Sequence, residues 1–261
     1  METESAADFV RMTRDALAAA GFVRRTVDDV VYWERDGAEP PVVLVHGVND
    51  HAGTWFSIAP YLTARRVVLP DLAGHGESGP AAGPLPMSLL LSSLEAVIGR
   101  ERDIVLLGNS LGGWVATLYA LAHPDRVQQL VLESAGGLAR PFASPVTAAS
   151  RDEAIVVLRA VHGPRFDPPD WVIESLIARS KDSQLLRVTE GPEHALDGRL
   201  AELRLPVTLL WGADDGVLPL SYARELQSLI PSATLHVIEG AAHIPHLQQP
   251  EKFLQCLSSI F

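Results

Sequence analysis

The chain has 261 residues, of which 47% are hydrophobic, so it can bury the core of one large α/β domain and is not a disordered chain. Its net charge of -11 argues against nucleic acid or an anionic membrane as the main partner. The single cysteine, Cys256, excludes an internal disulfide framework, and we expect it to be a small core residue. Residues 1–4 lack a signal-peptide pattern and no apolar run reaches the length of a membrane span, so we expect a soluble cytoplasmic protein.

Residues 5–20 carry apolar side chains at helical spacing, and Gly21 closes this pattern, which predicts a short N-terminal helix. After it, apolar runs typical of strands alternate with helical patterns. Such alternation requires crossover connections and predicts a mostly parallel sheet flanked by helices on both faces. The predicted strands are residues 27–34, 41–45, 66–69, 104–107, 127–133, 206–210 and 234–238, and the predicted helices are 54–62, 87–99, 114–122, 152–161, 170–178, 219–229 and 250–260.

The alternation of strands and helices stops after Gly137. Residues of about 138–204 contain helical runs but no strand pattern of comparable strength. We therefore predict an α/β core made of residues 1–137 and 205–261. Residues 138–204 are predicted to form a helical cap, inserted after the strand that follows the helix at 114–122.

The pattern G-N-S-L-G at residues 108–112 lies between the apolar run 104–107 and the helical pattern 114–122. A strand that enters a helix through G-x-S-x-G is typical of a nucleophile elbow. Glycines flank the serine because a Cβ at either position would collide with the neighbouring strand or helix. The turn would lift the Ser110 hydroxyl clear of the sheet, beside the positive end of a helix. The pattern therefore predicts that Ser110 is a nucleophile.

A serine hydroxyl needs a base that takes its proton and an acid that orients the base. In open parallel sheets such groups gather beyond the carboxyl ends of the strands. The strand at 206–210 leads into Asp214 and Asp215, and the strand at 234–238 leads to His243. The order Ser, Asp, His along the chain is the order expected for this elbow.

Four motifs in this order resemble the α/β-hydrolase superfamily, in its capped, cofactor-independent form, over roughly residues 26–261. They are H-G at 46–47, D-L-A-G-H-G-E-S at 71–78, the elbow, and the paired segments that carry the acid and the base. The W-G-A-D-D-G-V-L-P segment that begins at Trp211 is similar to the family's W-G-x-x-D-x-x-x-P. This register implies that Asp215, rather than Asp214, is the acid.

The base segment at residues 240–250 resembles the family's G-x-x-H-x-x-x-x-E-x-P, which implies that His243 is the base. Gln248 or Gln249 stands where the family often has glutamate. The resemblance also implies an oxyanion hole of backbone N–H groups, one from Leu111 and one from Val48. The chain reads H-G-V-N where lipase-like relatives read H-G-G-G, which favours a narrower site around the acyl carbonyl.

Four further histidines have structural interpretations. We expect His46 to shape the turn below the oxyanion hole and His75 to be structural. His51 and His246 are expected near the mouth of the site, where a role in a solvated loop is favoured over a substrate contact. The nine histidines show no metal-ligand spacing, so we expect no metal, and the resemblance implies no cofactor.

The predicted substrate is a small or medium, largely apolar carboxylic ester, because the cap carries large apolar residues that are expected to roof the site. We expect the protein to act on it as a monomer or homodimer. Most apolar side chains of the cap are expected to pack the cap against itself. The candidate substrate contacts are Asn49, Asn109, Phe142, Trp171 and Ile244.

The leading hypothesis is a carboxylesterase that works through an acyl-enzyme intermediate. G-N-S-x-G-G is also similar to the elbow of hydrolases that cleave carbon–carbon bonds in vinylogous diketones. Those relatives carry tryptophan after the base histidine and a glycine-rich oxyanion loop, where this chain has Ile244 and Val48-Asn49. A cofactor-free perhydrolase and a ligand sensor without turnover are further alternatives. Haloalkane dehalogenases and epoxide hydrolases of this fold attack with aspartate, so Ser110 argues against them.

Overall fold

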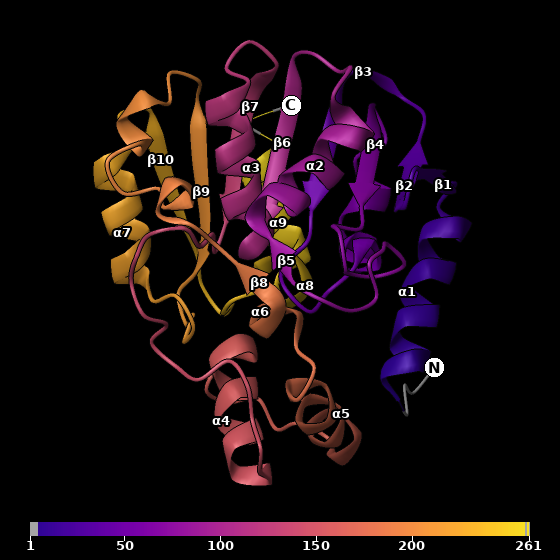
Figure 1. The fold of residues 1–261 in the computed structure, drawn as a ribbon, viewed down its shortest axis with the longest axis vertical. Coiled ribbons are helices and arrows are strands. Elements are labelled where there is room, and N and C mark those ends of the chain that lie inside the picture. Colours follow the sequence, from indigo (N-terminus) through magenta and orange to yellow (C-terminus); the bar gives the residue numbers. More distant parts are fainter. Residues whose placement is uncertain (1–4, 259, 261) are drawn as a thin grey trace.

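An eight-stranded sheet forms the centre of the computed structural model, which describes residues 5–258 and 260 (Figure 1). Residues 1–4, in which the sequence shows no signal-peptide pattern, lie outside the described residues. The strand order is β1-β2-β4-β3-β6-β7-β9-β10. The strands are β1 (Val23–Val27), β2 (Val30–Arg35), β3 (Ala38–Val45), β4 (Arg65–Pro70), β6 (Ile104–Asn109), β7 (Val127–Glu133), β9 (Val207–Gly212) and β10 (Ala233–Ile238).

The six strands from β4 to β10 in this order are parallel, as the alternation of strands and helices predicts. The edge differs from the prediction, because β1 and β2 form an antiparallel hairpin where one strand was expected at 27–34. The hairpin turns at Asp28, which has a φ of 49°. Its first strand, β1, is mostly exposed and polar, so it lacks the apolar pattern that marks a strand in the sequence.

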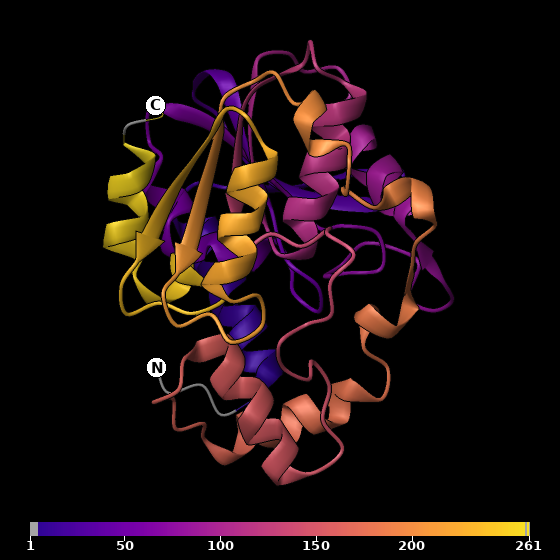
Figure 2. The same ribbon diagram turned by 90° about the vertical axis from the view of Figure 1, so that its left-hand side faces the viewer.

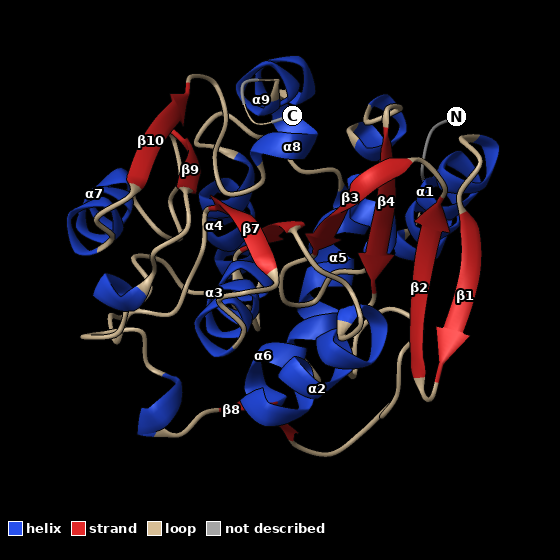
Figure 3. Ribbon diagram, turned by 90° about the horizontal axis from the view of Figure 1, so that it is seen from above, coloured by secondary structure: helices blue, strands red, loops and turns tan. Residues whose placement is uncertain are grey.

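Helices cover both faces of the sheet (Figure 3). Successive residues of a strand point to opposite faces, so Val43 and Val45 belong to the apolar cluster on one face, which also contains side chains of α2, α3 and α7. Val42 and Leu44 pack on the other face, under α1 and α9. The helices are α1 (Ala6–Ala19), α2 (Met87–Ile98), α3 (Leu111–Ala122), α4 (Arg151–His162), α5 (Asp170–Ser180), α6 (Gln184–Arg187), α7 (Leu220–Leu229), α8 (Pro245–Gln248) and α9 (Pro250–Leu257).

The segment predicted as one helix at 54–62 is instead two short 3-10 helices, η1 (Ala52–Ser57) and η2 (Ala59–Tyr61). Pro60 lies in the first turn of η2, and its missing N–H cannot continue a helical ladder from the preceding turn. Two further 3-10 turns, Pro192–His194 and Leu200–Glu202, lie between α6 and β9.

The chain between β7 and β9 forms a helical insertion that contains α4, α5 and α6, beyond the carboxyl ends of the strands (Figures 1 and 2). The insertion has its own apolar cluster, with Ala154, Val157, Leu158 and Ile173 buried in it. A two-stranded sheet that the sequence pattern did not reveal ties it to the core. In this sheet β8 (Val188–Thr189) pairs with β5 (Leu85–Pro86). The insertion therefore stands over the edge of the sheet where β6, β9 and β10 end.

The junction of β6 and α3 requires glycine because backbone atoms approach each other there. A Cβ on Gly108 would collide with the backbone of Gly112 and Gly113. A Cβ on Gly112 would collide with the carbonyl groups of Val45 and His46 at the end of β3. The start of α3 can therefore lie directly against two neighbouring strands.

We expect Gly112→Ala to lower the free energy of unfolding by about 2 kcal/mol or more, because the backbone must move to admit the methyl group. Gly136→Ala is the matched control, since its Cβ would meet only Ser110 O, at 3.9 Å. Urea denaturation of both variants and the wild type measures the difference. Equal midpoints for the two variants would contradict this account of the elbow.

Candidate active site

Three loops at one edge of the sheet bring together the three residues that the sequence singles out. Ser110 follows β6, Asp215 follows β9 and His243 follows β10. Nε2 of His243 lies 3.1 Å from Oγ of Ser110, and Nδ1 of His243 lies 2.9 Å from Oδ2 of Asp215. These are hydrogen-bond distances, so the three groups can act as a nucleophile, a base and an acid that orients the base.

The backbone of Ser110 lies in a strained conformation, with φ 51° and ψ -114°. Hydrogen bonds on both sides hold it there. Its N–H donates to Glu133 O at 3.0 Å, and its carbonyl oxygen accepts from Gly136 N at 3.1 Å and from Trp114 N at 3.2 Å. The side chain thereby stands at the N-terminus of α3, where the helix dipole favours negative charge.

The carboxylate of Asp215 is fully buried. Its Oδ1 accepts hydrogen bonds from the backbone N–H groups of Val217 and Leu218, both at 2.9 Å. These bonds turn Oδ2 toward the imidazole. Asp214, the neighbouring carboxylate, is exposed and stands outside this network.

His243 is buried between charges of one sign. Burial lowers the pKa of its imidazole, but the charge and hydrogen bond of Asp215, with the charge of Glu133, outweigh burial and raise it above the ordinary value. A raised pKa means that the site stabilises the imidazolium. This is the form that the base takes after it accepts a proton from Ser110.

The loop after β3 passes directly beside the nucleophile. A Cβ on Gly47 would lie 2.7 Å from Oδ1 of Asn109 and 3.4 Å from Cβ of Ser110. His46 is buried below this loop, and its Nε2 accepts from Leu72 N at 3.0 Å. Burial, with the charges of nearby histidines, lowers the pKa of His46 well below its ordinary value, so the ring is neutral and holds the loop.

The residues named as substrate contacts lie in different surroundings. Oδ1 of Asn49 accepts from Ser183 Oγ at 2.9 Å and from Gln184 N at 2.8 Å, so it joins the loop after β3 to the insertion. Asn109 is buried, and its Nδ2 donates to His243 O at 3.2 Å. Both amides thus have structural partners. Phe142 is 45% exposed, whereas Trp171 in α5 and Ile244 after the base are partly buried.

The insertion also supports the loops that carry Asp215 and His243. The sequence did not reveal this support. At the end of α4, Ala160 O accepts from Gly216 N at 3.0 Å, beside the acid. The next carbonyl, Val161 O, accepts from His243 N at 3.0 Å. The last turn of α4 therefore fixes the backbone of both loops.

Two histidines differ from the expectation of solvated loops. His51 is buried and its Nδ1 accepts from Gly53 N at 2.9 Å, which caps η1. His246 is fully buried, and its Nδ1 lies at hydrogen-bond distance from the carboxylate of Glu133, 2.8 Å from Oε2. The expectation of a solvated loop was wrong for both, because both rings are buried against polar partners. His46 and His75 are buried and hydrogen-bonded, as a structural role requires.

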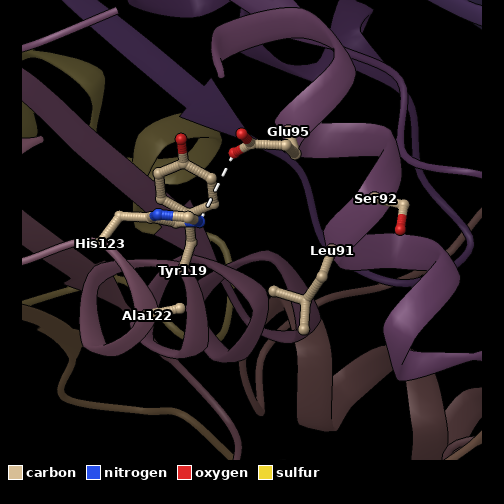
Figure 4. Close-up of a pocket in the computed structure, with 6 residues that line it drawn as sticks. All are labelled: Leu91, Ser92, Glu95, Tyr119, Ala122 and His123. Carbon is tan, nitrogen blue, oxygen red and sulfur yellow. Dashed lines mark ion pairs between the residues drawn. The ribbon is translucent and has the colours of Figure 1, made fainter. Parts of the chain in front are cut away.

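Ser110 lines neither of two hollows in the described part of the chain. One, of about 450 Å³, lies behind the acid loop between Arg159 and Asp214. The other, of about 160 Å³, lies between α2 and α3, where Glu95 pairs with His123 next to the ring of Tyr119 (Figure 4). The triad residues do not line this second hollow.

A family comparison agrees with this geometry. The model of the alpha/beta hydrolase family matches residues 42–255, which is most of the chain. The chain belongs to the alpha/beta hydrolase family. Within the part of the chain that the structure describes, no helix is long and apolar enough to cross a membrane.

Esterases and lipases are among the proteins to which this hydrolase is similar. A pimeloyl-(acyl-carrier protein) methyl ester esterase of Edwardsiella ictaluri is 30% identical over 87% of this chain and 95% of its own. The monoacylglycerol lipase abhd6-B of Xenopus laevis is 25% identical over 84% and 74%. Among solved structures, a membrane phospholipase A superposes with a TM-score of 0.78 at 25% identity, covering 97% of this chain and 90% of the other.

His162, the last residue of α4, gives the hydrolase a pH-dependent stability. Burial and the nearby charge of His243 lower the pKa of His162 to about 4. The folded protein keeps this ring neutral while the unfolded chain protonates it near pH 6.5. Its contribution to stability is therefore present above pH 6.5 and is lost as the pH falls toward 4.

Between pH 6.5 and 4, we expect the unfolding free energy of the wild type to fall by roughly 2 kcal/mol more than that of His162→Gln. Urea denaturation at several pH values measures this difference. His236→Gln, a change at an exposed histidine of β10, is the control and should follow the wild-type curve. Parallel curves for the wild type and His162→Gln would show that burial does not hold this ring neutral.

Proposed function

We propose that the protein is a carboxylic ester hydrolase that works through an acyl-enzyme on Ser110, with His243 as general base and Asp215 as the acid that orients it. The 3.1 Å contact between Nε2 of His243 and Oγ of Ser110 carries the proposal. The esterases and lipases among the relatives support the class of reaction. The raised pKa of His243 suits a base that must hold a proton in the transition state.

In the proposed reaction, Oγ of Ser110 attacks the ester carbonyl while Nε2 of His243 takes the hydroxyl proton. Asp215 holds the proton on Nδ1 and stabilises the imidazolium. The proton then passes to the leaving alcohol, and the acyl group remains on Ser110. Water repeats the same steps, with His243 as its base, and releases the carboxylic acid.

The tetrahedral oxyanion is proposed to lie between the backbone N–H groups of Val48 and Leu111. Leu111 is the first residue of α3, so its N–H has no partner one turn earlier in the helix. Gly47, before Val48, packs against Ser110, which brings this loop beside the reacting atoms. Removal of one such donor typically costs about 3 kcal/mol of transition-state stabilisation.

Residues 138–204 are proposed to be the cap of this site, with residues 1–137 and 205–261 as the catalytic core. The proposed substrate is a small or medium ester with a largely apolar acyl group. Trp171 and Ile244 are partly buried, and Phe142 is exposed, so each has surface that a bound acyl group can cover. Asn49 and Asn109 are proposed to shape the site by holding its loops.

We expect Ser110→Ala to lower kcat for p-nitrophenyl butanoate by at least about a thousandfold, because the nucleophile is removed. Ser134→Ala is a matched control, since this buried serine also follows a strand and its hydroxyl has no hydrogen-bond partner among the described residues. We expect it to keep kcat within about twofold of the wild type. Equal activity of wild type and Ser110→Ala, or no activity in either, would refute the proposed hydrolysis.

The acyl preference tests the proposed substrate class. For p-nitrophenyl esters of increasing chain length, we expect kcat/KM to be highest between butanoate and octanoate. It should fall at least about tenfold for hexadecanoate, because the longer chain cannot be covered under the cap. A kcat/KM that rises steadily to hexadecanoate would indicate a long-chain lipase instead.

A further inference from the structure

A second buried carboxylate and imidazole lie behind the triad. The side chains of Glu133 and His246 are both fully buried. Nδ1 of His246 lies 2.8 Å from Oε2 of Glu133, and the backbone N–H of His246 donates to Oε1 at 2.8 Å. A buried pair of this kind seldom stabilises a fold more than apolar side chains of the same volume would, because both groups lose their hydration. Stability alone therefore does not explain why this pair is buried next to the triad.

The imidazole of His246 is fixed on every side. Its Nε2 lies 3.2 Å from Oγ1 of Thr54, and its ring lies over Trp55 with centroids 4.2 Å apart. Its carbonyl oxygen accepts from Oγ of Ser57 at 2.7 Å. Because His246 lies three residues after His243, fixing His246 fixes the loop that carries the base.

Glu133 also contacts the nucleophile elbow through its backbone. Its carbonyl oxygen accepts from Ser110 N at 3.0 Å. Nδ2 of Asn109 lies within 3.5 Å of the same carbonyl oxygen and donates to His243 O at 3.2 Å. One residue at the end of β7 thus contacts the elbow with its backbone and the base loop with its side chain.

The charge of Glu133 acts on the base as well. The titratable groups that act on His243 come from three elements: Asp215 from the acid loop, Glu133 from β7 and His162 from α4; His246 from α8 lies against Glu133. Asp215 and Glu133 raise the pKa of His243, whereas burial lowers it. Asp215 contacts the imidazole directly. Glu133 is not a member of the triad, yet its charge also raises the pKa of His243.

We propose that Glu133 is a positioning residue of this active site: through His246 it fixes the loop that carries His243, and its charge supports the imidazolium of His243. This inference rests on the proposed function, because it assigns the residue to the same proton transfer. Glu133 would contribute in two ways: its hydrogen bonds with His246 hold the base loop, and its charge stabilises the imidazolium of His243.

Three variants separate these contributions. Glu133→Gln keeps the size of the side chain and removes the charge. Glu133→Asp keeps the charge on a shorter side chain. Thr54→Val cuts the outer hydrogen bond of His246 and leaves the carboxylate unchanged.

The readouts are the pH profiles of kcat/KM and of the rate at which a fluorophosphonate probe labels Ser110. For Glu133→Gln we expect the acidic limb of both profiles to move to lower pH by about one unit, since the imidazolium loses a favourable charge. The rate on the plateau should fall about tenfold, with KM within about twofold of the wild type. Glu133→Asp should restore the position of the limb, and Thr54→Val should leave it in place.

The probe reaction keeps this test separate from the choice of substrate, because labelling needs only Ser110 and its base. A wild type that is labelled but hydrolyses no ester would refute the proposed function and still give the profile of Glu133→Gln. A limb that stays in place in Glu133→Gln, or that moves equally in Thr54→Val, would overturn the inference.

If Glu133→Gln does not fold, His246→Gln tests the same idea. It releases the base loop but keeps the carboxylate, so the labelling rate should fall while the acidic limb does not move to lower pH. A move to lower pH in His246→Gln would overturn the role of the Glu133 charge.

Discussion

The active site depends on the strained backbone of Ser110, which turns the chain from β6 into α3 within one residue. Its positive φ is retained because glycines let α3 lie against β3 and β6, and because Glu133 and Gly136 bind its N–H and carbonyl groups. This conformation lifts the hydroxyl out of the sheet toward His243. It also leaves the first N–H groups of α3 beside the place where an oxyanion would form.

The loops around this turn support one another across long distances in the sequence. Asp215 contacts the imidazole of His243, and α4 of the insertion binds the backbone of the loops that carry these two residues. Asn49 joins the loop after β3 to α6. In this arrangement the insertion, which we propose as the cap, also supports the loops that carry Asp215 and His243. The buried Glu133–His246 pair completes the support from the side of the sheet opposite α3.

Local patterns predicted the parts of the fold that depend on local physics. The apolar strands, the elbow and the three strand ends that carry Ser110, Asp215 and His243 follow from spacing and from the rule that parallel strands end at one edge. The exposed strand β1 carries no apolar pattern, and the burial of His246 depends on a partner 113 residues away. Glu133 did carry a signal, since a carboxylate closes an apolar strand at the same edge as the acid.

The most direct test of the proposed mechanism is a crystal structure of the wild type after reaction with a phosphonate that mimics the tetrahedral intermediate. The account requires a covalent bond between phosphorus and Oγ of Ser110, with one phosphonyl oxygen within hydrogen-bond distance of the N–H groups of Val48 and Leu111. His243 should then lie between the adduct and Asp215. An adduct on another residue, or a phosphonyl oxygen that points away from these two N–H groups, would contradict the account.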